Sequence, residues 1–251
     1  MGPEGQVGER RSKKLEEIAG FAEIILRYVR EFLPDQDLTI LEGSCGKSYL
    51  GFALALLFPD VDDRNIRFWG VDSNPELIER CRTLAGELGL DNSRFVASRT
   101  IEFESQKDFN LVVSLHACDT ATDETMAKGI QLGARLVLAV PCCQNQIRGQ
   151  IKKGHPLTPM TDFGPARYRL ANLLTDTLRA QFMHAAGYHV QLDEIGSPRL
   201  TPKNLCICAR KVKRKSRTPR DTEYRRLREL FNVRPRIEKL CPEVIDDEKS
   251  L

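Results

Sequence analysis

Hydrophobic positions follow a helical period near the start of the chain. From Leu15 onward apolar residues recur at helical spacing, which predicts an amphipathic helix over 13–34 that is ended by Pro34. Residues 1–12 are polar and Gly-rich and show no period, which predicts a disordered leader.

The pattern then changes to short β-rich runs, most of them separated by segments with the character of helices. The runs are 38–41, 66–71, 94–96, 111–115 and 136–140, and the clearest helices between them are 49–57 and 75–88. Strands that alternate with helices predict a parallel, doubly wound α/β sheet with helices on both faces.

The last third of the chain breaks this alternation. A helix predicted at 165–186 is followed by a strand at 188–195, a nine-residue loop at 196–204 and a strand at 205–211. Because so short a loop has no room for a crossover helix, the two strands should form an antiparallel hairpin. The predicted domain therefore spans 35–211, and 212–251 is left as a basic, partly helical tail with a helix around 223–231.

Composition narrows the class of protein. With 251 residues, 41% hydrophobic and 29% charged, the chain can bury one sizeable core. It contains no long apolar run and no signal-peptide core, so we expect a cytoplasmic protein without membrane association. The eight cysteines are then expected to be reduced thiols.

The first predicted strand enters its helix through a turn of small residues. The turn contains Glu42, Gly43, Ser44 and Gly46, with Ser48 just beyond. Small residues let the backbone approach a ligand closely, and a helix N-terminus directs N–H groups toward it. This turn is therefore a candidate for binding a nucleotide-like cofactor.

The second predicted strand ends in Gly70-Val71-Asp72, and Ser73 follows it. An acid in this position accepts hydrogen bonds from ribose hydroxyls in nucleotide-binding βαβ units. The alternative is that this loop only caps the next helix, a role that Ser73 or Asn74 could fill. Ser98 follows the third strand, where contacts to adenine commonly lie.

Chemistry-bearing residues follow the fourth and fifth strands. One loop runs from Ser114 through His116 and Cys118 to Asp123, and the other is Pro141-Cys142-Cys143-Gln144. Because open α/β sheets bind ligands at the carboxyl edge of their strands, we expect these two loops to converge there.

The element His-x-Cys-x-x-Ala-Thr-Asp at 116–123, together with the Cys142-Cys143 pair, resembles a methyltransferase-domain family that includes a eukaryotic tRNA 2′-O-methyltransferase. The resemblance spans roughly 14–211 and includes Thr201-Pro202-Lys203-Asn204 in the hairpin loop. It implies a Rossmann-like class I methyltransferase, in which a mostly parallel seven-stranded sheet ends in an antiparallel hairpin. It also implies S-adenosylmethionine as cofactor and RNA as a reasonable substrate class.

On this interpretation the candidate residues fall into three groups. The cofactor would contact Glu42, Gly43, Ser44, Gly46, Asp72, Ser73, Ser98, Ser114 and His116. The substrate would contact Pro141, Cys142, Cys143, Gln144, Lys203 and Asn204. His116 could act as general base, with Asp119 or Asp123 orienting it or a substrate hydroxyl. The alternatives are a structural histidine and aspartates or threonines that cap the following helix.

Three thiols and one imidazole at neighbouring strand ends also raise the possibility of zinc. Adjacent cysteines, here Cys142 and Cys143, are hard to aim at one ion. We therefore expect no metal, and buried thiols that line a pocket instead.

Charge distribution suggests a partner. The basic run 210–220, together with the loop 145–164, would offer a surface suited to the phosphates of RNA. Other functions remain open: a protein or small-molecule methyltransferase on the same fold, or a non-catalytic module that binds the cofactor. A P-loop nucleotide hydrolase is less favoured, because Leu41 stands where that motif requires glycine.

Overall fold

The computed structural model describes residues 9–61, 64–151, 157–196, 203–212 and 220–245. Seven strands form one sheet: β1 (Leu38–Gly43), β2 (Ile66–Asp72), β3 (Ser93–Ala97), β4 (Leu111–Leu115), β5 (Leu136–Val140), β6 (Tyr188–Glu194) and β7 (Leu205–Lys211). The α-helices are α1 (Glu9–Phe32), α2 (Tyr49–Val61), α3 (Pro75–Glu87), α4 (Thr120–Gln131), α5 (Asn145–Gln150), α6 (Thr158–Thr161), α7 (Gly164–Ala185), α8 (Arg220–Phe231) and α9 (Arg236–Leu240). Short 3₁₀ turns lie at Thr100–Glu102 and Pro242–Val244.

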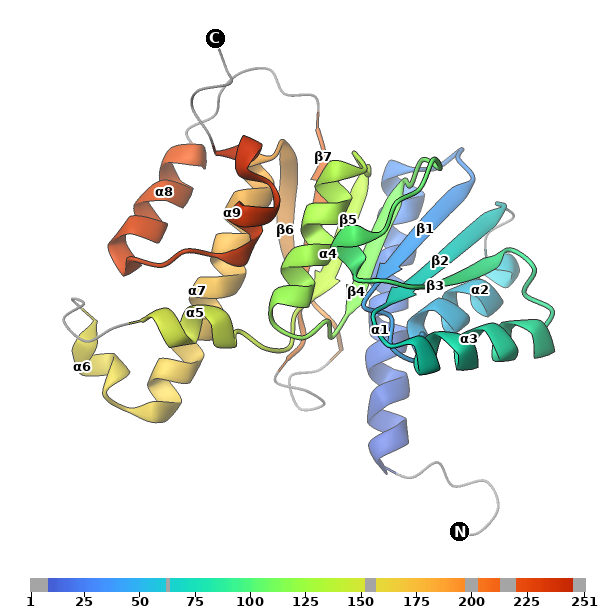
Figure 1. Ribbon diagram of the computed structural model, residues 1–251, viewed down its shortest axis with the longest axis horizontal. Coiled ribbons are helices and arrows are strands. Elements are labelled where there is room, and N and C mark those ends of the chain that lie inside the picture. Colours follow the sequence, from blue (N-terminus) through green and yellow to red (C-terminus); the bar gives the residue numbers. More distant parts are fainter. Residues whose placement is uncertain (1–8, 62–63, 152–156, 197–202, 213–219, 246–251) are drawn as a thin grey trace.

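The sheet has the order β3-β2-β1-β4-β5-β7-β6 (Figure 1). The five strands from β3 to β5 are parallel, whereas β7 runs antiparallel to both β5 and β6. This confirms the predicted Rossmann-like fold with its antiparallel terminal hairpin. The chain moves outward from β1 to β3 and then returns to β4 on the other side of β1, so the carboxyl ends of β1 and β4 flank the switch point where such sheets bind ligands.

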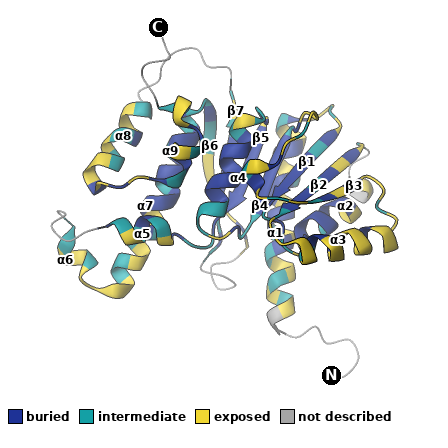
Figure 2. Cartoon of the chain, in the orientation of Figure 1, coloured by how far each residue is buried: buried dark blue, intermediate teal, exposed yellow. Residues whose placement is uncertain are grey.

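Both faces of the sheet are covered (Figure 2). One hydrophobic cluster joins α1, α2 and α3 to the sheet, and a second joins α4, α7, α8 and α9 to it. All five residues of β5 are buried, as expected for a parallel strand with helices on both sides.

The N-terminal helix begins at Glu9, four residues before the predicted start. The added turn contains Glu, Arg and Ser, and Glu and Arg are good helix formers. Because the turn has no apolar residues, the hydrophobic period did not reveal it. The predicted leader is therefore helical over 9–12, and the rest of it lies outside the described residues.

The C-terminal segment is more ordered than the tail predicted at 212–251. The segment that contains α8 and α9 has four completely buried residues: Tyr224, Val233, Ile237 and Cys241. The Cys241 thiol donates to the carbonyl of Ala127 in α4 at 3.7 Å. Charged residues surround these few apolar positions, so the sequence pattern concealed them. Residues 220–245 thus complete the second hydrophobic cluster.

Among the helices that the structure describes, none combines the length and apolar character that a membrane span requires.

Candidate active site

The turn after β1 has an unusual backbone. Ser44, Gly46 and Ser48 all adopt a positive φ, at 52°, 55° and 49°. Glycine favours this conformation, and serine adopts it at a cost. A Cβ atom added at Gly46 would meet nothing within 4 Å, so the backbone is open to a ligand at this point. A Cβ at Gly43, in contrast, would lie 2.3 Å from the Thr125 hydroxyl. The lack of a side chain at Gly43 therefore allows β1 to pack closely against α4.

Replacing the two serines by glycine gives a matched pair of variants. Ser44→Gly should stabilise the fold by about 0.5 to 1 kcal/mol, because it relieves a left-handed serine. Ser48→Gly should instead destabilise it by about 1 kcal/mol, because the Ser48 hydroxyl donates to a buried carboxylate. Urea unfolding of both variants would check this, and equal effects of the same sign would contradict it.

Glu42 lies beneath this turn and is only 3% exposed. The Ser48 hydroxyl donates to its Oε2 atom at 2.6 Å, and burial raises the pKa of the carboxyl to about 7. Glu42 therefore holds the turn through Ser48 and has little surface left to contact a ligand.

The raised pKa of Glu42 makes stability depend on pH. Because the folded state favours the protonated carboxyl, this contribution is fully present below pH 4.5, the ordinary value, and is lost as pH rises through about 7. Between pH 5 and pH 8.5 the unfolding free energy of the wild type should fall by about 2 to 3 kcal/mol more than that of Glu42→Gln. Denaturant unfolding without cofactor at several pH values would measure the difference, and parallel pH profiles would contradict it.

Asp72 connects the loops after the first three strands. Its Oδ2 atom accepts from the Gly46 amide and its Oδ1 atom from the Asn74 amide, each at 2.9 Å, while its carbonyl accepts from the Ser98 amide at 3.0 Å. The Asn74 side chain accepts from the first turn of α3 and is its N-cap. Asn74 is therefore the residue that caps α3. Asp72 is not needed for that role and remains half-exposed beside the open Gly46 backbone.

His116 also has a strained backbone, with φ at 60°. Of the five non-glycine residues with positive φ in the described ranges, four lie in the loops after β1 and β4: Ser44, Ser48, His116 and Asp119. Strain of this kind persists where the surrounding structure enforces it, often at functional sites. The two loops that flank the switch point are thus also the strained ones.

The His116 side chain pairs with the N-terminal helix. Its Nε2 atom lies 3.1 Å from Oε2 of Glu17, and Glu17 also pairs with Lys14 at 3.5 Å. Burial and the Lys14 charge lower the pKa of His116, although Glu17 opposes them. A neutral imidazole that donates from Nε2 to Glu17 keeps a lone pair on Nδ1, and Nδ1 is buried without a hydrogen-bond partner in the described part of the chain.

Glu17 had no signal in the sequence. It stands beside Lys14 at a spacing that is ordinary on a solvated helix, and 99 residues separate it from His116. Only the packing of α1 across the sheet brings the two side chains together.

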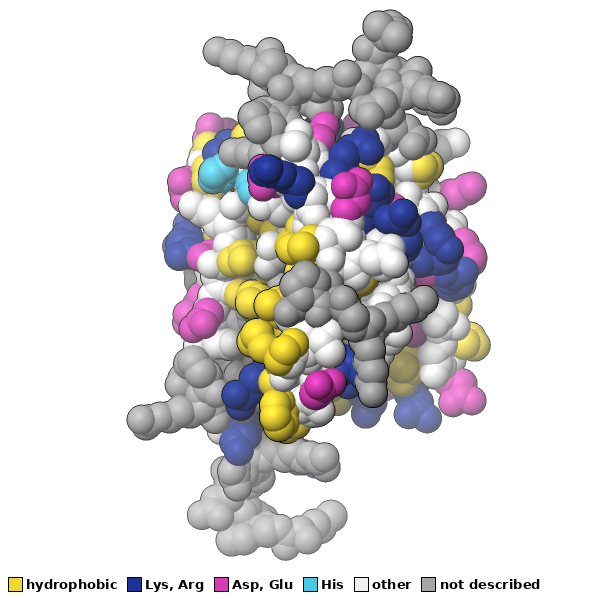
Figure 3. All heavy atoms as spheres, turned by 90° about the vertical axis from the view of Figure 1, so that its left-hand side faces the viewer, with side chains coloured by type: hydrophobic (Ala, Val, Ile, Leu, Met, Phe, Trp, Pro, Cys, Tyr) yellow, Lys and Arg dark blue, Asp and Glu magenta, His cyan; other side chains and the backbone are white. Residues whose placement is uncertain are grey.

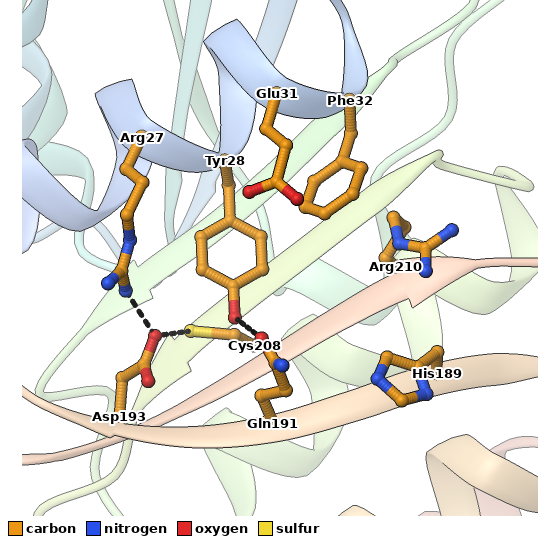
Figure 4. Close-up of a pocket in the computed structure, with 9 residues that line it drawn as sticks. All are labelled: Arg27, Tyr28, Glu31, Phe32, His189, Gln191, Asp193, Cys208 and Arg210. Atoms are coloured by element: carbon orange, nitrogen blue, oxygen red, sulfur yellow. Dashed lines mark hydrogen bonds and ion pairs between the residues drawn. The ribbon is translucent and has the colours of Figure 1, made fainter.

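The other end of α1 is fixed on the hairpin (Figure 4). Arg27 forms an ion pair with Asp193, and the Tyr28 hydroxyl donates to Gln191 Oε1 at 2.7 Å. Both contacts lie in a cavity of about 380 Å³ between α1 and strands β6 and β7. They position α1 so that its first half reaches the loop after β4.

Neither predicted aspartate contacts His116. The Asp119 carboxylate accepts from the Gln146 amide at 3.1 and 3.2 Å and so caps α5. Asp123 is 3% exposed and pairs with the Arg179 guanidinium at 3.0 and 3.1 Å. Asp123 faces α7 from the first turn of α4, so the prediction that it orients the base is wrong, and Glu17 occupies that position.

Ser114 is completely buried within β4, and its hydroxyl has no partner among the described residues. The structure does not present it to a cofactor. Ser73 is exposed and Ser98 half-buried, both at the edge where Asp72 lies.

The loop after β5 meets the hairpin loop. Gln144 is buried, donates to Asp176 at 3.0 Å and accepts from the Lys203 ammonium at 3.1 Å. The same ammonium lies 4.8 Å from the ring centroid of Tyr168, and Arg148 lies over that ring at 5.7 Å. The two loops thus bring two cations to one half-exposed aromatic ring.

The remaining predicted substrate residues divide by burial. Pro141 and Asn204 are buried, whereas Cys142 and Cys143 are half-buried. Thr201 and Pro202 lie outside the described residues. Lys203, Cys142 and Cys143 are therefore the members of the predicted substrate group that keep accessible surface.

Among the residues that the structure describes, the cations of the predicted phosphate surface do not lie in one patch. Because β7 runs antiparallel, it ends beside the start of β5, where Arg210 pairs with Leu136. The loop 145–164 follows the opposite end of β5, so the described ends of the two basic segments lie at opposite edges of the sheet. On the face shown in Figure 3, described Lys and Arg side chains are interspersed with acidic and hydrophobic ones. Residues 152–156 and 213–219, which carry many of the predicted cations, lie outside the described residues.

The fold and the loops at its switch point define a Rossmann-like α/β protein of the methyltransferase type. Residues 13–150, more than half of the chain, match a protein family described as "Methyltransferase domain". The chain therefore belongs to this methyltransferase-domain family.

Curated relatives share the sequence over part of their length. The glutathione S-transferase C-terminal domain-containing protein of Homo sapiens is 26% identical over 193 residues, which cover 67% of this chain and 29% of that protein. Its counterpart from Xenopus laevis is 29% identical over 118 residues, covering 47% of this chain and 18% of that protein. The chain spans less than a third of the length of these relatives.

Solved structures support the fold. Magnesium protoporphyrin IX methyltransferase from Synechocystis PCC 6803 with bound SAH superposes with a TM-score of 0.53 at 12% identity, covering 83% of this chain and 90% of that one. The same enzyme with bound SAM gives a TM-score of 0.50, covering 83% and 86%. At this identity the likeness concerns the fold.

Proposed function

We propose that this chain is an S-adenosylmethionine-dependent methyltransferase that methylates a hydroxyl group of RNA. The observation that supports this most directly is the arrangement of two loops at the switch point of a methyltransferase-family fold. One loop holds the half-exposed Asp72 carboxylate beside the open Gly46 backbone. The other holds His116, whose Nε2 atom pairs with Glu17 and whose Nδ1 atom has no hydrogen-bond partner among the described residues.

The residues of the turn fit the cofactor. Asp72 offers the charge that ribose hydroxyls favour, and the open backbone at Gly46 leaves room for a nucleoside. When bound, S-adenosylmethionine supplies an electrophilic methyl group. Methyl transfer then requires an oriented nucleophile and a group that accepts its proton.

We assign to His116 the role of accepting that proton, which requires a substrate hydroxyl to reach its buried Nδ1 atom. Glu17 fixes the ring through Nε2, which leaves Nδ1 as the acceptor, and a lowered pKa keeps the imidazole neutral near pH 7. With a substrate hydroxyl oriented toward that methyl group, His116 would accept the hydroxyl proton and pass it to solvent.

The substrate class rests on two observations. The Asn/Asp-Pro-Pro-aromatic pattern of many amino-group methyltransferases is absent from the sequence, which favours a hydroxyl nucleophile. Lys203 and Arg148 lie over the half-exposed ring of Tyr168, which suits a nucleobase stacked near a phosphate.

Transfer of label from tritiated cofactor into a cell extract would test the proposal. Counts that nuclease releases and protease does not are expected. Counts that follow protease digestion would support the protein-methylating alternative. Calorimetry with S-adenosylmethionine against magnesium and ATP would separate both from a nucleotide hydrolase.

Asp72 should govern affinity for the cofactor. Asp72→Ala should weaken S-adenosylmethionine binding by about 1.5 to 3 kcal/mol, because charge-assisted hydrogen bonds to the ribose would be lost. Asp72→Asn should cost less, since it keeps one acceptor. Calorimetry on variants with native melting curves would measure both, and wild-type affinity in a folded Ala variant would place the ribose elsewhere.

A further inference from the structure

Three thiols from two loops lie together beside the proposed substrate end of the site. The Sγ atoms of Cys118, Cys142 and Cys143 all lie within 4.8 Å of one another, and those of Cys142 and Cys143 are 3.7 Å apart. Cys118 comes from the loop after β4, and the adjacent pair comes from the loop after β5. The sequence suggested that adjacent cysteines would be hard to aim at one ion, but the sulfurs of this pair lie close together.

The spacing of the sulfurs suits a tetrahedral thiophilic cation. Zinc binds thiolates at about 2.3 Å, and tetrahedral angles then separate two sulfurs by about 3.8 Å. The adjacent pair already has this separation. Cys118 is exposed and so has freedom to rotate toward the pair. Soft sulfur ligands select zinc over magnesium or calcium, which prefer oxygen.

The thiols have only weak protein partners that a cation would replace. Cys142 donates to the carbonyl of His116 at 3.5 Å. A divalent cation displaces the protons and offsets the mutual repulsion of the thiolates.

We propose that Cys118, Cys142 and Cys143 bind one zinc ion as three thiolates, with the fourth position taken by water or by a group of the substrate. Three protein ligands with one exchangeable position is the pattern of catalytic rather than structural zinc sites. The ion would also tie together the loops after β4 and β5, which carry His116 and Gln144. This proposal holds whether or not RNA is the substrate.

Metal analysis of the full chain tests the proposal. The protein would be expressed with added zinc and purified without chelators or metal-affinity resin, and zinc would be measured by plasma mass spectrometry. About one zinc per chain is expected in the wild type, and less than about a tenth of one in the triple variant Cys118→Ser, Cys142→Ser, Cys143→Ser. The matched control is Cys241→Ser, a buried cysteine outside the cluster whose hydrogen bond to Ala127 serine can keep.

Cobalt substitution gives a second readout that does not depend on the folding of variants. Cobalt added to the chelated wild type should produce the visible bands of tetrahedral coordination together with sulfur-to-cobalt charge transfer in the near ultraviolet. Either of two results would overturn the proposal: a metal-free wild type that also takes up no cobalt, or a folded triple variant that keeps its zinc. Methyl-transfer activity enters neither measurement, so failure here is distinguishable from failure of the proposed function.

Discussion

Asp123→Ala should destabilise the fold by about 3 to 5 kcal/mol, because it removes one partner from a buried ion pair. Arg179 is 1% exposed. Burial alone would lower the pKa of Arg179, but the carboxylates of Asp123 and Asp176 raise it above its ordinary value. After the substitution the Arg179 guanidinium keeps its hydrogen bonds to Asp176 and to the carbonyl of Asp119. It loses both hydrogen bonds to the Asp123 carboxylate. Urea unfolding at pH 7 would measure the loss.

A surface ion pair provides the control for this prediction. Glu79 pairs with Arg82 at 3.2 Å, and both side chains are at least half exposed. Glu79→Ala should therefore change stability by less than about 1 kcal/mol. The rate of methyl transfer per folded Asp123→Ala molecule should stay near the wild-type value. A variant of native stability whose rate fell a hundredfold would restore Asp123 to the catalytic group.

The order of elements could be predicted because each strand was marked by a run of apolar residues and each turn by small or polar ones. The hairpin from β6 to β7 followed from loop length alone. The helix predicted around 223–231 corresponds to α8, but the packing of 220–245 was not predicted, because its few buried positions, such as Tyr224 and Ile237, stand among charged residues and lie on short helices. The period of hydrophobic residues detects long amphipathic helices better than it detects isolated buried residues.

The two halves of the site differed in how much the sequence revealed. Asp72 and Gly46 each belong to a strand-turn-helix unit, and the order of units fixes where such a turn lies. The partners of His116 and Asp123 come from other elements, α1 and α7. A sequence indicates that α4 has a buried face but not which side chain of another helix meets it. This is why Asp123 was assigned to chemistry and Glu17 was not identified.

His116→Ala should leave affinity for the cofactor nearly unchanged and lower turnover by about 10²- to 10⁴-fold, the range for loss of a general base. The separation follows from position: His116 follows β4, which lies on one side of β1, whereas Asp72 ends β2, which lies on the other side. Calorimetry and single-turnover methyl transfer would measure the two quantities independently. Normal turnover in a folded variant would make the histidine structural.

The pH dependence of turnover identifies the base more sharply than its removal does. Protonated imidazole cannot accept a proton, so kcat should fall on the acid side, with a midpoint below the ordinary histidine value of 6.5. Glu17 stabilises the protonated ring and Lys14 opposes it. Glu17→Gln should therefore move the acid limb to lower pH and Lys14→Met should move it to higher pH. A histidine that only supported the loop would leave the limb in place in both variants, because the titrating group would then lie elsewhere.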